Sequence, residues 1–281
     1  MTDAELRVLL DRRVERPISE PVDSHTVATW CDTFGWDRRP GDSPIPALVY
    51  PVFLRPAAPP EHAPQTGVVL HDELKSALGF PVAIAIGYEI ELLGEVRVGD
   101  RLCPVERIGT LGDERETRFG PGREWIIEIS TTTVEGRDVG VERFRMLGYR
   151  PGDGVSGQSR SHGSPIESTW SETRPIDAET IRRSARAARV WAGAHHETDA
   201  ARAAGLDDII LDTSSQVALL TAAARRHRGD VEPTRVSLTM RRPVLPASTL
   251  VIGGIDQGLQ TTVRASVDGR ETSSAVITFG G

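Results

Sequence analysis

The chain has 281 residues, of which 38% are hydrophobic and 26% are charged, and its formal net charge is −7. This length suits two domains of about 100–150 residues, and the acidic charge argues against nucleic acid or an anionic membrane as the main partner. The longest apolar run, residues 80–87, is far shorter than the roughly 20 residues of a membrane-spanning helix. The acidic N-terminus does not resemble a signal peptide. We therefore expect a cytoplasmic protein.

The two cysteines, Cys31 and Cys103, exclude a disulfide framework and a cysteine-based zinc site. The histidines and acidic residues show no spacing typical of a metal site, and no glycine-rich nucleotide-binding motif is present. We therefore expect neither a metal nor another cofactor.

The first half begins with helical and irregular segments. Residues 23–34 have apolar side chains at helical spacing behind Asp23, which suits an N-cap. The many prolines in residues 49–64 exclude a helix there. A second helix is predicted over residues 71–78, with Gly79 at its end. Four strands are predicted to follow, at residues 83–96, 98–111, 125–134 and 138–147.

A linker is predicted between the two halves of the chain. Residues 151–175 are rich in Gly, Ser and Pro and contain few large apolar side chains. They separate a first domain, residues 1–150, from a second domain, residues 176–281. Glu135-Gly136-Arg137 and Asp268-Gly269-Arg270 fall at matching turns of the two domains. The order of elements repeats as well, which indicates an internal duplication.

The second domain carries the stretch on which the functional prediction depends. Its helices are predicted over residues 176–190, 199–205 and 212–229. The first of these leads into a loop with two adjacent histidines, His195 and His196. Asp212 or Thr213 is expected to cap the long third helix. Three or four strands are predicted to close the chain.

The repeated order of helices and antiparallel strands resembles the double hotdog fold, an α+β architecture in which each half places a long helix against a curved antiparallel sheet. The second half is similar to MaoC-like (R)-specific enoyl-thioester hydratases, whose motif has the form D-x-N-P-[LIV]-H-x5-[AS], followed by A-x-x-A-G-[FY]. His195, Ala201 and the residues up to Leu206 match the end of this motif. The first half resembles the dehydratase domain of type I fatty acid synthases, which often precedes a MaoC domain.

Three motif positions differ from that family. Val190 stands at the place of the motif's Asp, Ala192 at that of its Asn, and Gly193 at that of its Pro. In the family, the Asp and the His share one water molecule, and a backbone N–H at the start of the long helix binds the thioester oxygen. The resemblance therefore implies His195 as the base and the helix start near Thr213 as the oxyanion donor, without the motif's Asp.

The hydration of an enoyl thioester needs a base, an acid and hydrogen-bond donors for the oxygen that becomes negative. The candidate catalytic residues are His195, Asp212 and Asp199, and the candidate substrate-binding residues are Thr213, Ser214, His196 and Asp37. Each has a structural interpretation as well: the histidines as loop residues, Asp212 and Asp199 as helix caps, and Asp37 as a turn residue.

Three functions stay open. The favoured one is an acyl-thioester hydratase or dehydratase with an altered active site, acting on an acyl group carried by coenzyme A or by acyl carrier protein. The lost Asp motivates two others. One is a hotdog domain recruited to isomerisation or cyclisation in secondary metabolism, and the other is a non-catalytic acyl-thioester binder or partner subunit. Monomer and homodimer are both compatible with the sequence.

Overall fold

The computed structural model of the protein describes residues 3–37, 43–59, 68–151 and 167–280. Its helices are α1 (Asp3–Leu10), α2 (Ser24–Phe34), α3 (Tyr50–Phe53), α4 (Val69–Ala77), α5 (Ala178–Ala187), α6 (Thr198–Ala203) and α7 (Thr213–His227), with short 3-10 turns η1 (Ala47–Val49) and η2 (Gly193–His195). Its strands are β1 (Arg13–Glu15), β2 (Val82–Leu92), β3 (Leu102–Leu111), β4 (Arg115–Thr117), β5 (Gly120–Thr133), β6 (Asp138–Tyr149), β7 (Trp170–Ile176), β8 (Pro233–Met240), β9 (Ser248–Gln257), β10 (Gln260–Val267) and β11 (Arg270–Phe279).

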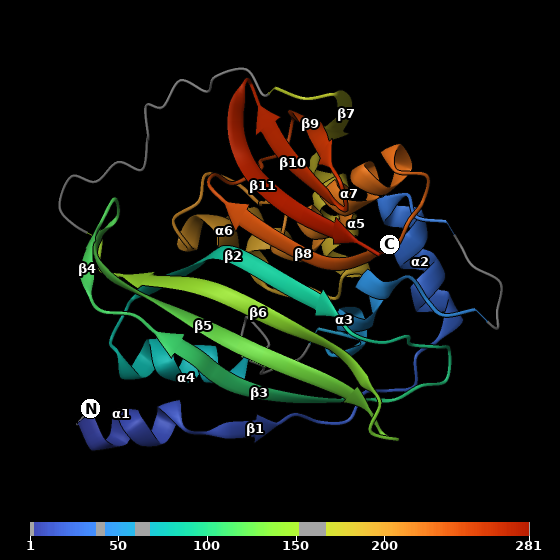
Figure 1. The fold of residues 1–281 in the computed structure, drawn as a ribbon. Helices are drawn as coiled ribbons and strands as arrows, with labels where there is room; N and C mark the ends of the chain where they lie inside the picture. The colour runs from blue at the N-terminus through green and yellow to red at the C-terminus, as the bar shows by residue number, and fades with distance from the viewer. Residues whose placement is uncertain (1–2, 38–42, 60–67, 152–166, 281) are drawn as a thin grey trace.

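One antiparallel sheet of 11 strands runs through both halves in the order β1-β3-β5-β6-β2-β8-β11-β10-β9-β7, with β4 paired to β5 (Figure 1). The halves meet where β2 pairs with β8, from Gly87 opposite Thr239 to Glu91 opposite Arg235. Outward from this junction the order is the same on both sides, since β2, β6, β5, β3 and β1 correspond to β8, β11, β10, β9 and β7. The strand order therefore agrees with the duplication predicted from the sequence.

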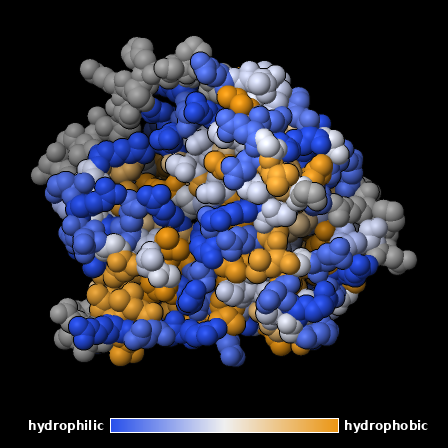
Figure 2. All heavy atoms as spheres, viewed as in Figure 1, coloured by the Kyte–Doolittle hydropathy of each residue, from blue (hydrophilic) through white to orange (hydrophobic). Residues whose placement is uncertain are grey.

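Charged side chains cross the outer face of this sheet from strand to strand. Ion pairs link Arg107, Glu128, Arg143, Glu89 and Arg235 in that order, which takes them from β3 across the junction to β8. These pairs range from partly buried, at Glu128, to exposed, at Arg235, and the exposed ones add little stability singly. Figure 2 shows hydrophilic residues spread among apolar ones over the face on which the strands lie in Figure 1.

Helix α7 is the central helix of the second half. Its residues from Ser215 to Arg225 are all buried, and it packs against β8, β9, β10 and β11. Ala218, Ala222 and Ala223 are among these buried residues, and their small side chains permit close packing around the helix. The long helix predicted over residues 212–229 is thereby confirmed, with the backbone N–H of Ser215 donating to the Asp212 carboxylate as the N-cap bond.

The first half lacks a comparable helix among its described residues. Helix α2 has 11 residues but packs against α5 and α7 of the second half. Helix α3 has 4 residues and α4 has 9, whereas α7 has 15. The expectation of a long helix in each half is therefore wrong for the first half. A physical reason lies just after α3, where Pro56 and Pro59 cannot continue a helix. The expectation that residues 49–64 contain no helix is wrong for α3, because Pro51 falls in its first turn, where a proline costs no helix hydrogen bond. The other early helix agrees with prediction, since Asp23 caps α2.

The segment predicted as a linker is only partly described. Residues 152–166 lie outside the described residues. Its last residues are not a loop, because residues 170–176 form β7, which pairs with β9 from Trp170 opposite Gly254 to Ile176 opposite Ser248. Four consecutive polar residues, Ser171 to Arg174, give this edge strand a composition that resembles that of a linker. None of the described helices is both long and apolar enough to cross a lipid bilayer.

Candidate active site

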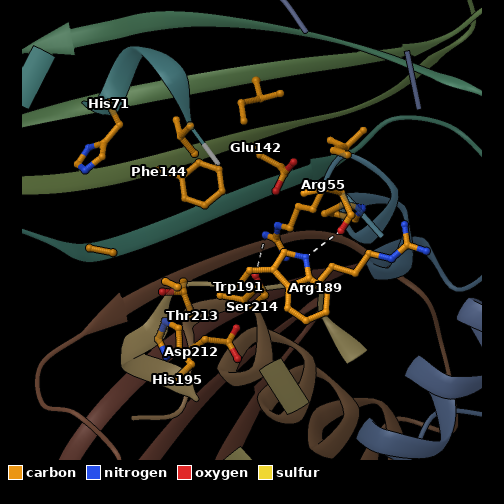
Figure 3. Close-up of a pocket in the computed structure, with 18 of the residues that line it drawn as sticks. Arg55, His71, Glu142, Phe144, Arg189, Trp191, His195, Asp212, Thr213 and Ser214 are labelled. Carbon is orange, nitrogen blue, oxygen red and sulfur yellow. Dashed lines mark hydrogen bonds between the residues drawn. The ribbon is translucent and has the colours of Figure 1, made fainter. Parts of the chain in front are cut away.

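A cavity of about 230 Å³ lies between the two halves (Figure 3). The first half contributes Arg16, Pro51, Leu54, Arg55, Pro56, Val68, His71, Ala85, Ile129, Glu142, Phe144 and Met146, and the second half contributes Arg189, Val190, Trp191, Ala192, His195, Asp212, Thr213 and Ser214. In Figure 3, His71, Phe144 and Glu142 lie on one side and Thr213, Asp212 and His195 on the other. Four of the seven candidate residues therefore share one cavity: His195, Asp212, Thr213 and Ser214.

His195 is held in one orientation by the backbone of its own loop. It ends η2, and its Nδ1 lies 2.8 Å from the carbonyl oxygen of Ile210. A carbonyl oxygen only accepts hydrogen bonds, so Nδ1 carries the proton, and the neutral ring has an unprotonated Nε2. Because the side chain lines the cavity, this nitrogen can serve as a base for a molecule bound there.

The start of α7 supplies hydrogen-bond donors on the same side of the cavity. Asp212 is 2% exposed, and its two carboxylate oxygens accept from the backbone N–H and the hydroxyl of Ser215. The next helix hydrogen bond runs from the N–H of Gln216 to the carbonyl oxygen of Asp212. Within the described residues, the N–H groups of Thr213 and Ser214 have no acceptor. The positive end of the helix dipole and these two donors favour negative charge at this place.

The remaining three candidates lie outside the cavity lining. His196 faces the other way, with its Nε2 donating to the carbonyl oxygen of Val190 at 2.7 Å. Asp199 is exposed in the first turn of α6. Asp37 is exposed after Trp36, whose indole N–H donates to the carbonyl oxygen of Ala218. The sequence places His196 and Asp199 close to His195 along the chain, but the backbone turns their side chains elsewhere.

A buried carboxyl group faces the cavity from the first half. Glu142 lies in β6, is 2% exposed, and accepts a hydrogen bond of 2.6 Å from the hydroxyl of Tyr88. Burial raises the pKa of Glu142, against the opposing effects of the Arg55 charge, the Tyr88 bond and the Arg16 charge. Val190, at the place of the motif's Asp, also lines the cavity. The described lining thus offers two carboxyl groups, Glu142 and Asp212.

The guanidinium groups of Arg16 and Arg55, both in the first half, line the cavity together with Glu142. Arg55 donates to the carbonyl oxygen of Ala188 at 2.6 Å and to the hydroxyl of Ser214 at 2.9 Å, and so binds two places in the second half. Arg16 donates to the carbonyl oxygen of Leu54 at 3.0 Å. Burial lowers the pKa of Arg16, although the charge of Glu142 acts in the opposite direction. The cavity therefore has a polar wall as well as an apolar one.

His71 belongs to the wall formed by the first half. It is 3% exposed, and its Nδ1 accepts a hydrogen bond of 3.2 Å from the indole N–H of Trp125. Burial, with a smaller effect of the Lys75 charge, lowers the pKa of His71 to about 4. The ring is consequently neutral at pH 7, with its proton on Nε2. No group of three or more His, Cys, Asp or Glu side chains in the described part of the chain could hold a metal ion.

Sequence reasoning did not identify Arg16, Arg55, His71 or Glu142 as lining residues. One signal was available for Glu142, which alternates along β6 with Phe144 and Met146 on the inward face of a predicted strand. A charged residue among inward apolar positions points to a functional or paired group. The others have no local signal, because they come from separate segments of the first half that meet only in the folded chain.

Neither a protein family nor a curated protein matches the sequence. Solved structures do match. A MaoC-like dehydratase from Phytophthora capsici has a TM-score of 0.72 and 11% identity, over 97% of this chain and 96% of that one. HtdX from Mycobacterium tuberculosis has a TM-score of 0.63 and 18% identity, over 96% of this chain and all of that one.

A further match is a Mycobacterium tuberculosis protein described as having a double hotdog fold, with a TM-score of 0.58 and 14% identity over 95% of each chain. These similarities extend over nearly the whole chain and confirm the predicted α+β double hotdog fold. At such low identity they establish the fold that the chain shares with MaoC-like dehydratases.

Proposed function

We propose that the protein is an acyl-thioester hydratase or dehydratase, with its active site in the cavity between the two halves. The observation that carries the proposal is that His195 and the start of α7 line the same cavity. A base with an unprotonated Nε2 and two free backbone donors line the same small cavity. These groups match the two charges that develop when water adds to an enoyl thioester.

In the proposed reaction, Nε2 of His195 takes a proton from water while the water oxygen bonds to C3 of the 2-enoyl thioester. The electron pair of the double bond moves toward the thioester carbonyl, whose oxygen becomes negative and accepts from the N–H groups of Thr213 and Ser214. The imidazolium of His195 then returns the proton to C2. The product is a 3-hydroxyacyl thioester, and the reverse sequence of steps is the dehydration.

This mechanism gives His195 the proton-transfer work that an Asp and a His share in the family. Of the two carboxyl groups in the described lining, Asp212 is the nearer to His195 along the chain. Its hydrogen bonds to Ser215 suit it to holding the start of α7 in place. Asp199 has no part in the proposal, because it is exposed on α6. The ligand is an acyl thioester, carried by coenzyme A or by acyl carrier protein.

The test is an assay of the purified protein with 2-enoyl and 3-hydroxyacyl thioesters, following the absorbance of the conjugated thioester and identifying the product by mass. His195→Ala should lower kcat by about 10²–10⁴-fold, the usual contribution of an acid–base group. His25→Ala, at an exposed histidine of α2, is the matched control. Hydration is the wrong reaction if no thioester turns over, or if His195→Ala is as active as the unchanged protein.

A second candidate function is binding of acyl thioesters without catalysis. Val190 favours it, because an apolar side chain lines the cavity where the family's motif has its catalytic Asp. Calorimetric titration separates the two functions. Saturable binding of thioesters without turnover, equal in the unchanged protein and in His195→Ala, supports the binder.

A further inference from the structure

The wall of the cavity formed by the first half contains a hydrogen-bond donor that the proposed hydration does not use. Among the described residues, Trp125 is the only hydrogen-bond partner of the His71 ring, and it occupies Nδ1. The N–H of Nε2 therefore has no described acceptor, although the residue is 3% exposed and lines the cavity. The group opens into the cavity, and once a bound acyl chain displaces water from it, a donor left without an acceptor costs about 1–3 kcal/mol.

The surroundings of this donor are apolar. Trp125 belongs to a buried cluster with Val68 and Met146, and Ala85 and Phe144 pack against that cluster. The last four of these also line the cavity. A plain alkyl chain in this space would pack well but would leave the Nε2–H group unpaired. An acyl group with an oxygen atom beside His71 would satisfy the donor and keep the packing.

Building on the proposed function, we propose that the acyl group of the substrate is short and carries an uncharged oxygen acceptor, a ketone or a hydroxyl, that binds Nε2–H of His71. The cavity of about 230 Å³ is smaller than the roughly 300–1,000 Å³ of most small-molecule sites, which restricts the chain length. The neutral ring donates one hydrogen bond through Nε2–H and brings no positive charge that would offset a negative charge on the acyl group. An added carboxylate would meet the buried Glu142, with which Arg16 and Arg55 already interact.

Saturated thioesters test this inference without any turnover. The probes are the pantetheine thioesters of pentanoate, 4-oxopentanoate and succinate, because the pantetheine arm is common to coenzyme A and acyl carrier protein. The second and third have equal numbers of heavy atoms and differ in charge. We expect the 4-oxopentanoyl thioester to bind about tenfold more tightly than the other two in calorimetric titration, as one well-placed hydrogen bond allows.

Two variants connect this preference with the Nε2–H group. His71→Leu should bind the pentanoyl thioester as tightly as the unchanged protein, or more tightly, and should bind the 4-oxopentanoyl thioester no better than pentanoyl. His71→Gln, which keeps an N–H donor, should keep part of the preference. His25→Leu, the same substitution at an exposed histidine, should leave all three affinities unchanged. A general loss of structure would weaken all probes together, and so it differs from this pattern.

The outcomes separate this inference from the proposed function. Equal binding of the three probes, or tightest binding of the succinyl thioester, overturns the inference and leaves an acyl-thioester site in place. Absence of binding by all three probes overturns both proposals. A preference for 4-oxopentanoyl that survives His71→Leu shows that another group recognises the oxygen, and it overturns the role of His71.

Discussion

The guanidinium of Arg55 donates a hydrogen bond of 2.9 Å to the hydroxyl of Ser214, and so a residue of the first half reaches the start of α7 in the second half. Its other terminal nitrogen donates to the carbonyl oxygen of Ala188. A positive side chain and the positive end of a helix repel each other, whereas an anion close to both is attracted by both. This pair of residues therefore suits the negative thioester oxygen of the proposed reaction.

Replacement of Arg55 by Gln should lower kcat/KM for a 2-enoyl thioester by about 10–100-fold, because a hydrogen bond from a charged group contributes roughly 1.5–3 kcal/mol. Steady-state kinetics measure the effect, and Arg55→Lys should recover part of it. Arg202→Gln removes an exposed guanidinium of α6 and serves as the control. If the kinetics of Arg55→Gln were unchanged, the guanidinium would only connect the two halves and would not take part in the reaction.

Restoring the motif's carboxylate should increase activity. Val190 lines the cavity together with His195, and Val190→Asp places an acidic group where the resemblance expects the partner of the base. A second acid–base group typically adds about 10²–10⁴-fold to a rate, so we expect kcat to rise by at least tenfold. Val190→Asn has a similar shape and no charge, and it should give no increase. Equal rates for both variants would argue against hydration by this site.

Asp212 should matter for stability through the bonds that its carboxylate accepts. Asp212→Ala removes the acceptor of the Ser215 N–H at the buried start of α7, and loss of such a cap costs about 0.5–2 kcal/mol. Urea denaturation should show this decrease in the free energy of unfolding, whereas Asp212→Asn, with an equally good cap residue, should stay close to the unchanged protein. An unaltered midpoint for Asp212→Ala would contradict the capping role.

The low pKa of His71 predicts a dependence of stability on pH. The pKa is about 4 in the folded chain, against 6.5 for a free histidine. Between these values the unfolded chain binds the proton and the folded chain does not, so the free energy of unfolding falls as the pH falls from 6.5 to 4. The loss is at most about 3 kcal/mol, at 1.36 kcal/mol for each pH unit.

Denaturation of the unchanged protein and of His71→Gln at several pH values between 7 and 4 isolates this contribution. The raised pKa of Glu142 acts with the opposite sign, because the folded chain then binds the extra proton. That contribution is common to both proteins and cancels in the difference. Parallel stability curves for the two proteins would show that His71 does not stay neutral in the folded chain.

The second half could largely be predicted from the sequence, because its signals are local. An acidic residue before a long helical pattern identified Asp212 as the cap, and the motif's end identified His195, which lines the cavity with it. The part of the wall formed by the first half could not be predicted in the same way. Glu142, Arg55 and His71 lie in segments far apart along the chain, and only the three-dimensional pairing of strands brings them together.

The prolines that follow α3 bear on how a duplicated chain forms a cavity with two unlike walls. Pro51 in α3, Leu54 and Pro56 just after it, and Val68 just before α4 all line the cavity. A continuous helix in the first half, like α7 in the second, would fill the space that a substrate needs. In the proposed reaction, the second copy therefore supplies the long helix and the reactive groups, and the first copy supplies the space for the acyl group.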